Sequence, residues 1–134
     1  MGGINLKAGD TMPDLGTVTV TEERIGSVHK VKFDWTSEVG GGATKTTVQA
    51  YSGEIIRLLT IPGTAGDAPT NLYDVVVNDE DATDTLMGAG ANRAAASTEQ
   101  VLKASLGCMA NDTLSLAVTN AGDSNKGTVI LYIR

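Results

Sequence analysis

The runs TLSLAVTN (residues 113–120) and GTVILYIR (residues 127–134) decide the fold of this chain. In both runs apolar side chains occupy every second position: Leu114, Leu116 and Val118, then Val129, Leu131 and Ile133. This period of two predicts strands with one buried face, because successive side chains of a strand point to opposite sides. The connector between the runs is rich in Gly and Asn, which is typical of a long β-hairpin.

The same alternation extends toward the N-terminus. It recurs, with turn residues in between, at residues 17–22, 28–35, 44–51 and 72–78. Residues 54–61 are almost continuously Ile and Leu, so we expect a strand covered on both faces. About seven to nine short strands follow from this spacing. We therefore predict an all-β, single-domain antiparallel β-sandwich, jelly-roll-like, over residues 17–134.

The sequence of one stretch near the middle of the chain fits more than one type of secondary structure. Residues 84–96 are rich in Gly and Ala and show no clear period. Ser97 and Gln100 then have the spacing of a capping box, which favours one or two helical turns through Lys103. A strand over the same residues remains an open alternative.

Residues 1–16 show no periodicity and contain Gly, Asp and Pro, so they predict an extended N-terminal arm. A flexible tail and a partner-binding arm both fit this composition. If the arm binds a partner, its apolar side chains are the candidates for contact: Ile4, Leu6, Met12 and Leu15.

The charge of the chain argues against several classes of partner. The formal net charge is −6, and no Lys or Arg occurs between Arg57 and Arg93, where six carboxylates fall. Such a surface repels phosphates, so nucleic acid is not an expected partner. No apolar run approaches the roughly 18 residues of a membrane span, and the first residues do not resemble a signal peptide. We expect no membrane partner and synthesis and assembly in a cytoplasm.

Few residues suit catalysis. A general base needs a partner that orients it, and the one histidine, His29, lies in a predicted strand between apolar neighbours. The sequence has no Gly-x-Ser-x-Gly nucleophile motif. The one cysteine, Cys108, excludes an internal disulfide and is expected to be a small buried side chain. We predict a protein that is not an enzyme and has no cofactor.

One acidic cluster is a candidate for cation binding. Asp79, Asp81 and Asp84 fall together in a predicted turn, and calcium sites need several oxygen ligands on such a loop. The cluster lacks the spacing of an EF-hand, so a solvated turn is the simpler interpretation. A calcium- or glycan-binding β-sandwich module remains an alternative, although five aromatic residues leave little for a sugar platform.

From Tyr51 onward the chain resembles small structural proteins of tailed bacteriophages. The stretches that carry the resemblance are Tyr51–Pro62, Pro69–Asp81, Gly88–Arg93, Thr98–Gln100, Asn120–Gly122 and Lys126–Arg134. One departure is Ala82, where similar sequences have glycine after the aspartate. Alanine tolerates positive φ poorly, so the turn at this point is expected to differ in type.

The resemblance implies a capsid decoration (cement) protein that binds the major capsid protein on the outer capsid surface. It also implies a homo-oligomer, with a trimer favoured, located in the virion and assembled in the cytoplasm of the bacterial host. A tail or neck component, or a protein associated with receptor binding, is the structural alternative. The resemblance carries no catalytic or binding residue over to this chain.

Overall fold

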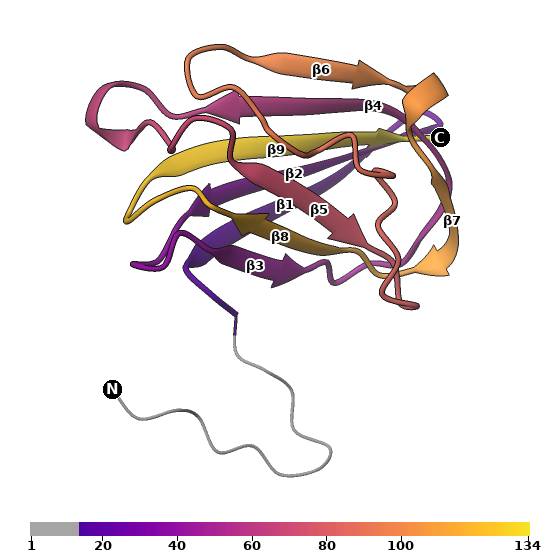
Figure 1. Ribbon diagram of the computed structural model, residues 1–134. Coiled ribbons are helices and arrows are strands. Elements are labelled where there is room, and N and C mark those ends of the chain that lie inside the picture. The colour runs from indigo at the N-terminus through magenta and orange to yellow at the C-terminus, as the bar shows by residue number, and fades with distance from the viewer. Residues whose placement is uncertain (1–13) are drawn as a thin grey trace, which may run out of the picture.

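The computed structural model describes residues 14–134, which form nine β-strands and two short 3₁₀ helices (Figure 1). The strands are β1 (Thr17–Ile25), β2 (Val28–Thr36), β3 (Ala43–Thr46), β4 (Tyr51–Pro62), β5 (Asp74–Asn78), β6 (Glu99–Leu102), β7 (Cys108–Asp112), β8 (Ser115–Thr119) and β9 (Lys126–Ile133). The helices are η1 (Ala65–Asp67) and η2 (Lys103–Ser105). All strand pairs are antiparallel, which confirms the predicted all-β class.

The strands form two sheets that lie face to face. The large sheet has six strands in the order β1-β2-β9-β4-β6, with β7 paired to β4, and the small sheet has the order β3-β8-β5. In the view of Figure 1 the small sheet lies in front of the large one. The prediction of a sandwich is confirmed at this level, whereas the jelly-roll connectivity is not established and stays a prediction.

The core lies between the two sheets and follows the alternation of the sequence. Its fully buried side chains include Val31, Phe33 and Trp35 of β2, Leu116 and Val118 of β8, and Val129, Leu131 and Ile133 of β9. Burying one such side chain stabilises the fold by about 1.5–3 kcal/mol.

Trp35 fixes the packing at one end of the core. Its ring lies 5.6 Å from the ring of Tyr73, measured between centroids, and it covers Gly127. A Cβ atom on Gly127 would come within 2.4 Å of the indole, so only glycine fits beneath this tryptophan. The position therefore requires glycine because of close packing, and the residue lies inside a strand.

The prediction of a long β-hairpin with its connector at residues 120–127 is wrong. β8 pairs with β3 and β5 in the small sheet, whereas β9 pairs with β2 and β4 in the large sheet. The connector crosses from one sheet to the other, and the hydroxyl of Ser37 holds it by donating to the carbonyl of Gly122 at 2.5 Å. Alternation shows that a strand has a buried face, but it does not show which sheet the strand joins.

The expectation that β4 is covered on both faces needs correction. The outer face of β4 is only half covered, because Leu59 and Ile61 are partly exposed while Leu58 and Thr60 are buried.

Of the two alternatives for the stretch after Ser97, the structure has the strand. Residues 99–102 form β6, and only the single 3₁₀ turn η2 follows. Within residues 14–134, no helix is both long enough and apolar enough to cross a membrane.

Candidate functional site

The base of the N-terminal arm is tied to the small sheet. The amide of Leu15 donates to Thr44 Oγ1 at 2.7 Å, and the amide of Thr44 donates to the Leu15 carbonyl at 2.9 Å. The carboxylate of Asp14 lies 3.4 Å from Lys45 Nζ. Leu15 itself remains 47% exposed, so its side chain is available to a partner. The other predicted contact residues of the arm, Ile4, Leu6 and Met12, lie outside the described residues.

Gly16 carries the chain from one sheet to the other. Leu15 pairs with β3 of the small sheet, and Thr17 pairs with Thr36 of the large sheet. Gly16 has φ +61°, and a Cβ atom there would lie 2.3 Å from the carbonyl oxygen of Thr36. Both the left-handed backbone and this contact require glycine. The last residues of the predicted arm are thus built into the sandwich.

The edge strand β1 is the most exposed element of the large sheet. Its nine residues pair with β2 in an unbroken register, and the backbone groups of its opposite edge bond to no other described residue. The side chains of Thr17, Thr19 and Thr21 are exposed, and those of Val18 and Val20 are half-buried. An open edge of this length is a template for pairing with another strand.

The long edge of the small sheet is covered. The loop of residues 84–93 lies along β5, where the Val75 amide donates to the Gly90 carbonyl at 2.8 Å and the Thr85 amide to the Val77 carbonyl at 2.8 Å. β3 receives the arm base at Leu15, and β6 spans only four residues. Among the strands described, β1 therefore stands out as the long edge without a cover.

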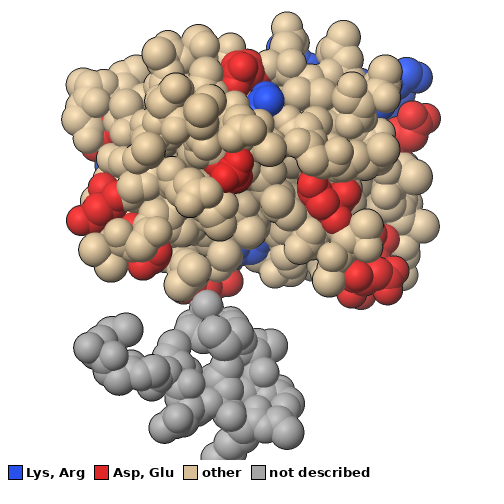
Figure 2. Space-filling model, viewed as in Figure 1, with Lys and Arg blue, Asp and Glu red and all other residues tan. Residues whose placement is uncertain are grey.

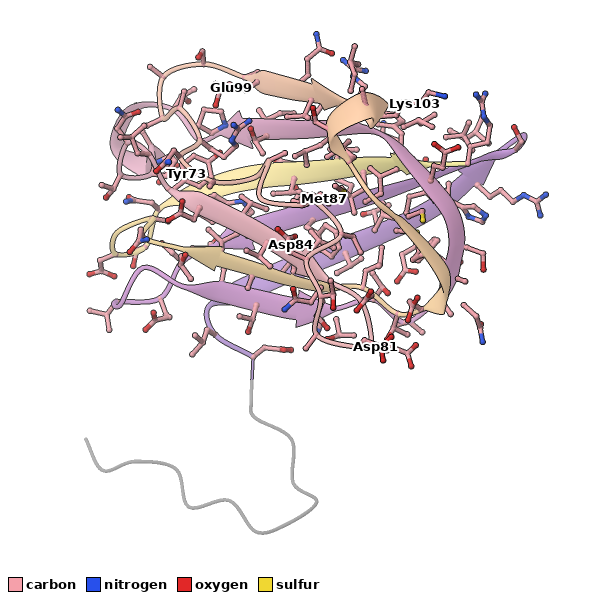
Figure 3. The ribbon with its side chains drawn as sticks, turned by 45° about the vertical axis from the view of Figure 1, so that its right-hand side comes forward. Tyr73, Asp81, Asp84, Met87, Glu99 and Lys103 are labelled. Atoms are coloured by element: carbon pink, nitrogen blue, oxygen red, sulfur yellow. The ribbon has the colours of Figure 1, made fainter. Side chains whose placement is uncertain are left out.

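In the acidic turn, where Figure 3 labels Asp81 and Asp84, carboxylates accept hydrogen bonds from the backbone. Asp79 Oδ1 accepts from the amides of Asp81 at 2.9 Å and Thr83 at 3.1 Å. The carboxylate of Asp84 accepts three amides, those of Val77, Leu86 and Gly88. These carboxylates hold the turn and the start of the covering loop, since each bond satisfies an amide that no ladder reaches.

The cation-binding interpretation of this turn has no support in its geometry. Within the part of the chain that the structure describes, no group of three or more His, Cys, Asp or Glu side chains is arranged to hold a metal ion. Ala82 adopts φ +58°, so alanine takes the left-handed conformation in this turn despite its poor tolerance of positive φ. The strain is local to an exposed turn.

The sequence did not predict how many carboxylates accept hydrogen bonds from backbone amides. Asp112 accepts from the amides of Glu80 and Ala110, and Glu80 accepts from the amide of Thr113. Asp74 accepts from the amide of Asn92 at 2.9 Å and from the Asn120 side chain at 2.7 Å. These bonds, the backbone bond first, lower the pKa of Asp74 below its usual value. The only signal in the sequence is the abundance of acidic residues near turns.

His29, the histidine considered as a general base, packs against a structural tyrosine. His29 contacts Tyr51 edge-on, with 5.4 Å between ring centroids and an interplanar angle of 81°. The Tyr51 hydroxyl donates to the carboxylate of Glu22, which also accepts the amides of Val48 and Gln49. Burial, reinforced by this bond, raises the pKa of Tyr51 well above its usual value. The arrangement fastens β1 to the connection that precedes β4.

The prediction that Cys108 is buried is wrong. The thiol is exposed at the first position of β7, because Met109 takes the inward position beside it and is 6% exposed. The alternation of a strand allows only one of two neighbours to point inward.

Charges are distributed unevenly over the surface. Carboxylates are spread over the face of the small sheet, with few Lys or Arg side chains among them (Figure 2). On the outer face of the large sheet, Lys30 Nζ and the Arg57 guanidinium lie 6.0 and 5.4 Å from the centre of the Tyr132 ring. This contact shields part of the outer face, where Ile130 is only 7% exposed.

No family model, no curated protein and no solved structure matched this chain.

Proposed function

We propose that this chain is a structural protein of a tailed-bacteriophage virion, and in particular a decoration protein that binds the major capsid protein on the outer capsid surface. The observation that carries the proposal is the attachment of the arm. Leu15 and Gly16, the last residues of the arm, are fixed to both sheets of a small sandwich. The described end of the arm is therefore joined to the sandwich at one defined place, as binding to an assembly through the arm requires.

The resemblance from Tyr51 onward supports the phage part of the proposal, and the described chemistry agrees with a binding role. The acidic side chains near the turns are engaged with backbone amides. Repeated weak contacts around a symmetric shell add up to tight attachment, so a decoration protein needs no single strong site.

The direct test is to image phage particles that carry this chain and to count its copies. Hundreds of copies on the head are expected. Copies in multiples of three or six, confined to the tail or neck, would replace this function with the structural alternative.

The stabilising role needs a separate measurement. Particles assembled without the chain should release their DNA at a lower temperature than complete particles, and adding back the purified chain should restore the resistance. An added-back chain that lacks residues 1–13 but keeps Asp14 to Arg134 should bind weakly if the arm makes contact. Equal heat resistance with and without the chain would discard the cementing role.

A further inference from the structure

We propose that β1 is a self-association edge, along which a second copy of this chain adds its own β1 in antiparallel orientation. The two large sheets would then form one continuous sheet across a two-fold axis. This inference rests on the described edge alone and does not depend on the proposed function.

The first support is that the described backbone of the edge is regular, and that its inward-facing carboxylate, Glu22, is already bound by the Tyr51 hydroxyl and the amides of Val48 and Gln49. β1 has no proline and no bulge, and its register with β2 runs through nine consecutive pairs. Edge strands of monomeric proteins usually carry such interruptions or inward-pointing charges, because open backbone groups recruit other strands. A loop covers β5, as the Val75–Gly90 bond shows, whereas no described residue bonds to the outer backbone edge of β1.

The second support is the composition of the strand. Residues 17–21 are alternating Thr and Val without a charge, which suits cross-strand pairing on both faces. Val18 and Val20 are only half-buried and would gain cover from the neighbouring strand. Exposed Thr side chains on the other face would pair with those of the second copy.

The third support is the placement of charge, which favours an antiparallel partner. With the axis at Thr21, Glu22 faces Val20 and Glu23 faces Thr19 of the other copy. With the axis at Val20, each Glu again faces Thr or Val. In-register parallel pairing would set each Glu opposite itself, and like charges directly opposite one another destabilise a sheet. A second copy in antiparallel orientation is therefore the occupant that the strand fits.

The test is sedimentation equilibrium of the full chain and of two double variants. The wild type should sediment as a dimer of 13.8 kDa chains. Thr19→Glu with Thr21→Glu should sediment as a monomer, because with either axis the new carboxylates face like charges of the other copy: each other about Val20, and each other or Glu23 about Thr21. In the fold Thr19 pairs with Asp34 and Thr21 with Lys32, so one new carboxylate gains a like charge and the other an opposite charge.

The control is Thr36→Glu with Thr128→Glu, which adds the same charge to the same face but on strands inside the sheet. The control should remain a dimer, and circular dichroism should show that both variants are folded. Amides of β1 that point away from β2 should exchange slowly in the wild type and fast in the edge variant.

Three results would overturn the inference. They are a wild type that is monomeric at every concentration, a trimer whose size the edge variant does not change, and equal dissociation of both double variants. The second result would favour the three-fold assembly that the resemblance implies. The third would point to association through the face of the sheet.

Discussion

At the scale of single residues, close contacts between backbone and side chains determine which residue a position accepts. Gly127 under Trp35 is one such place, and Gly16 between the sheets is another. Glycine is common in this chain, and its abundance predicts turns rather than close packing. The requirement at Gly127 could not be read from the sequence, because it depends on an indole that approaches from a strand about 90 residues away.

Gly127→Ala should lower the free energy of unfolding by about 1–3 kcal/mol, since the added methyl group overpacks the core against Trp35. Urea denaturation measures the change. The matched control is Gly66→Ala, where an added Cβ meets nothing within 4 Å and the stability should stay the same. Equal effects of the two substitutions would contradict the packing at Trp35.

Asp74 should make stability depend on pH in the acid range. Its pKa is lowered in the folded protein by the amide of Asn92 and the side chain of Asn120. The contribution is therefore complete above the unfolded value of about 3.9 and disappears as the pH falls through the lower folded value.

The measurement is the difference in unfolding free energy between the wild type and Asp74→Asn at a series of pH values. The wild-type advantage should shrink as the pH falls below about 4. An advantage that stays constant from neutral to strongly acid pH would mean that the Asp74 carboxylate is not stabilised by these bonds.

At the scale of elements, the start of the loop of residues 84–93 depends on one carboxylate. Asp84 accepts three backbone amides at the point where the chain leaves the acidic turn and runs along β5. Asp84→Ala leaves those amides without their acceptor and should cost about 1–3 kcal/mol.

Asp81→Ala is the control for this loop. Asp81 lies in the same turn, but its carboxylate accepts no hydrogen bond from the described residues. Thermal unfolding should lower the melting temperature of Asp84→Ala and leave that of Asp81→Ala close to the wild type. Hydrogen exchange should also become faster at Gly88 and Leu86 in the first variant only.

The strands were largely predictable, and their partners were not. Alternation in residues 28–35 and 127–134 marks β2 and β9 because a half-buried strand must alternate. The assignment of β8 and β9 to different sheets rests on contacts between distant parts of the chain. Local spacing also overstated the capping box at Ser97, where pairing with β4 selects a strand. The candidate site was harder to predict than the strands. The sequence of β1 does not show that no other described strand pairs with its outer edge.

At the scale of the whole molecule, calcium should have no effect on stability. A ligand that binds the folded state raises the melting temperature by mass action. Because Asp79 and Asp84 already accept backbone amides, we expect equal melting temperatures in millimolar calcium and in chelator. A clear rise with calcium would restore the cation-binding alternative.

The attachment at Leu15 and Gly16 has a mechanical consequence. A load applied along the arm reaches the small sheet through the two bonds between Leu15 and Thr44, and the large sheet through Thr17 and Thr36. Tension is therefore shared between two sheets at the point of entry and does not peel one strand alone. In a single-molecule pulling experiment, a chain held by its N-terminus should resist more force than the same chain carrying Thr44→Val, in which the hydroxyl acceptor of Leu15 is lost.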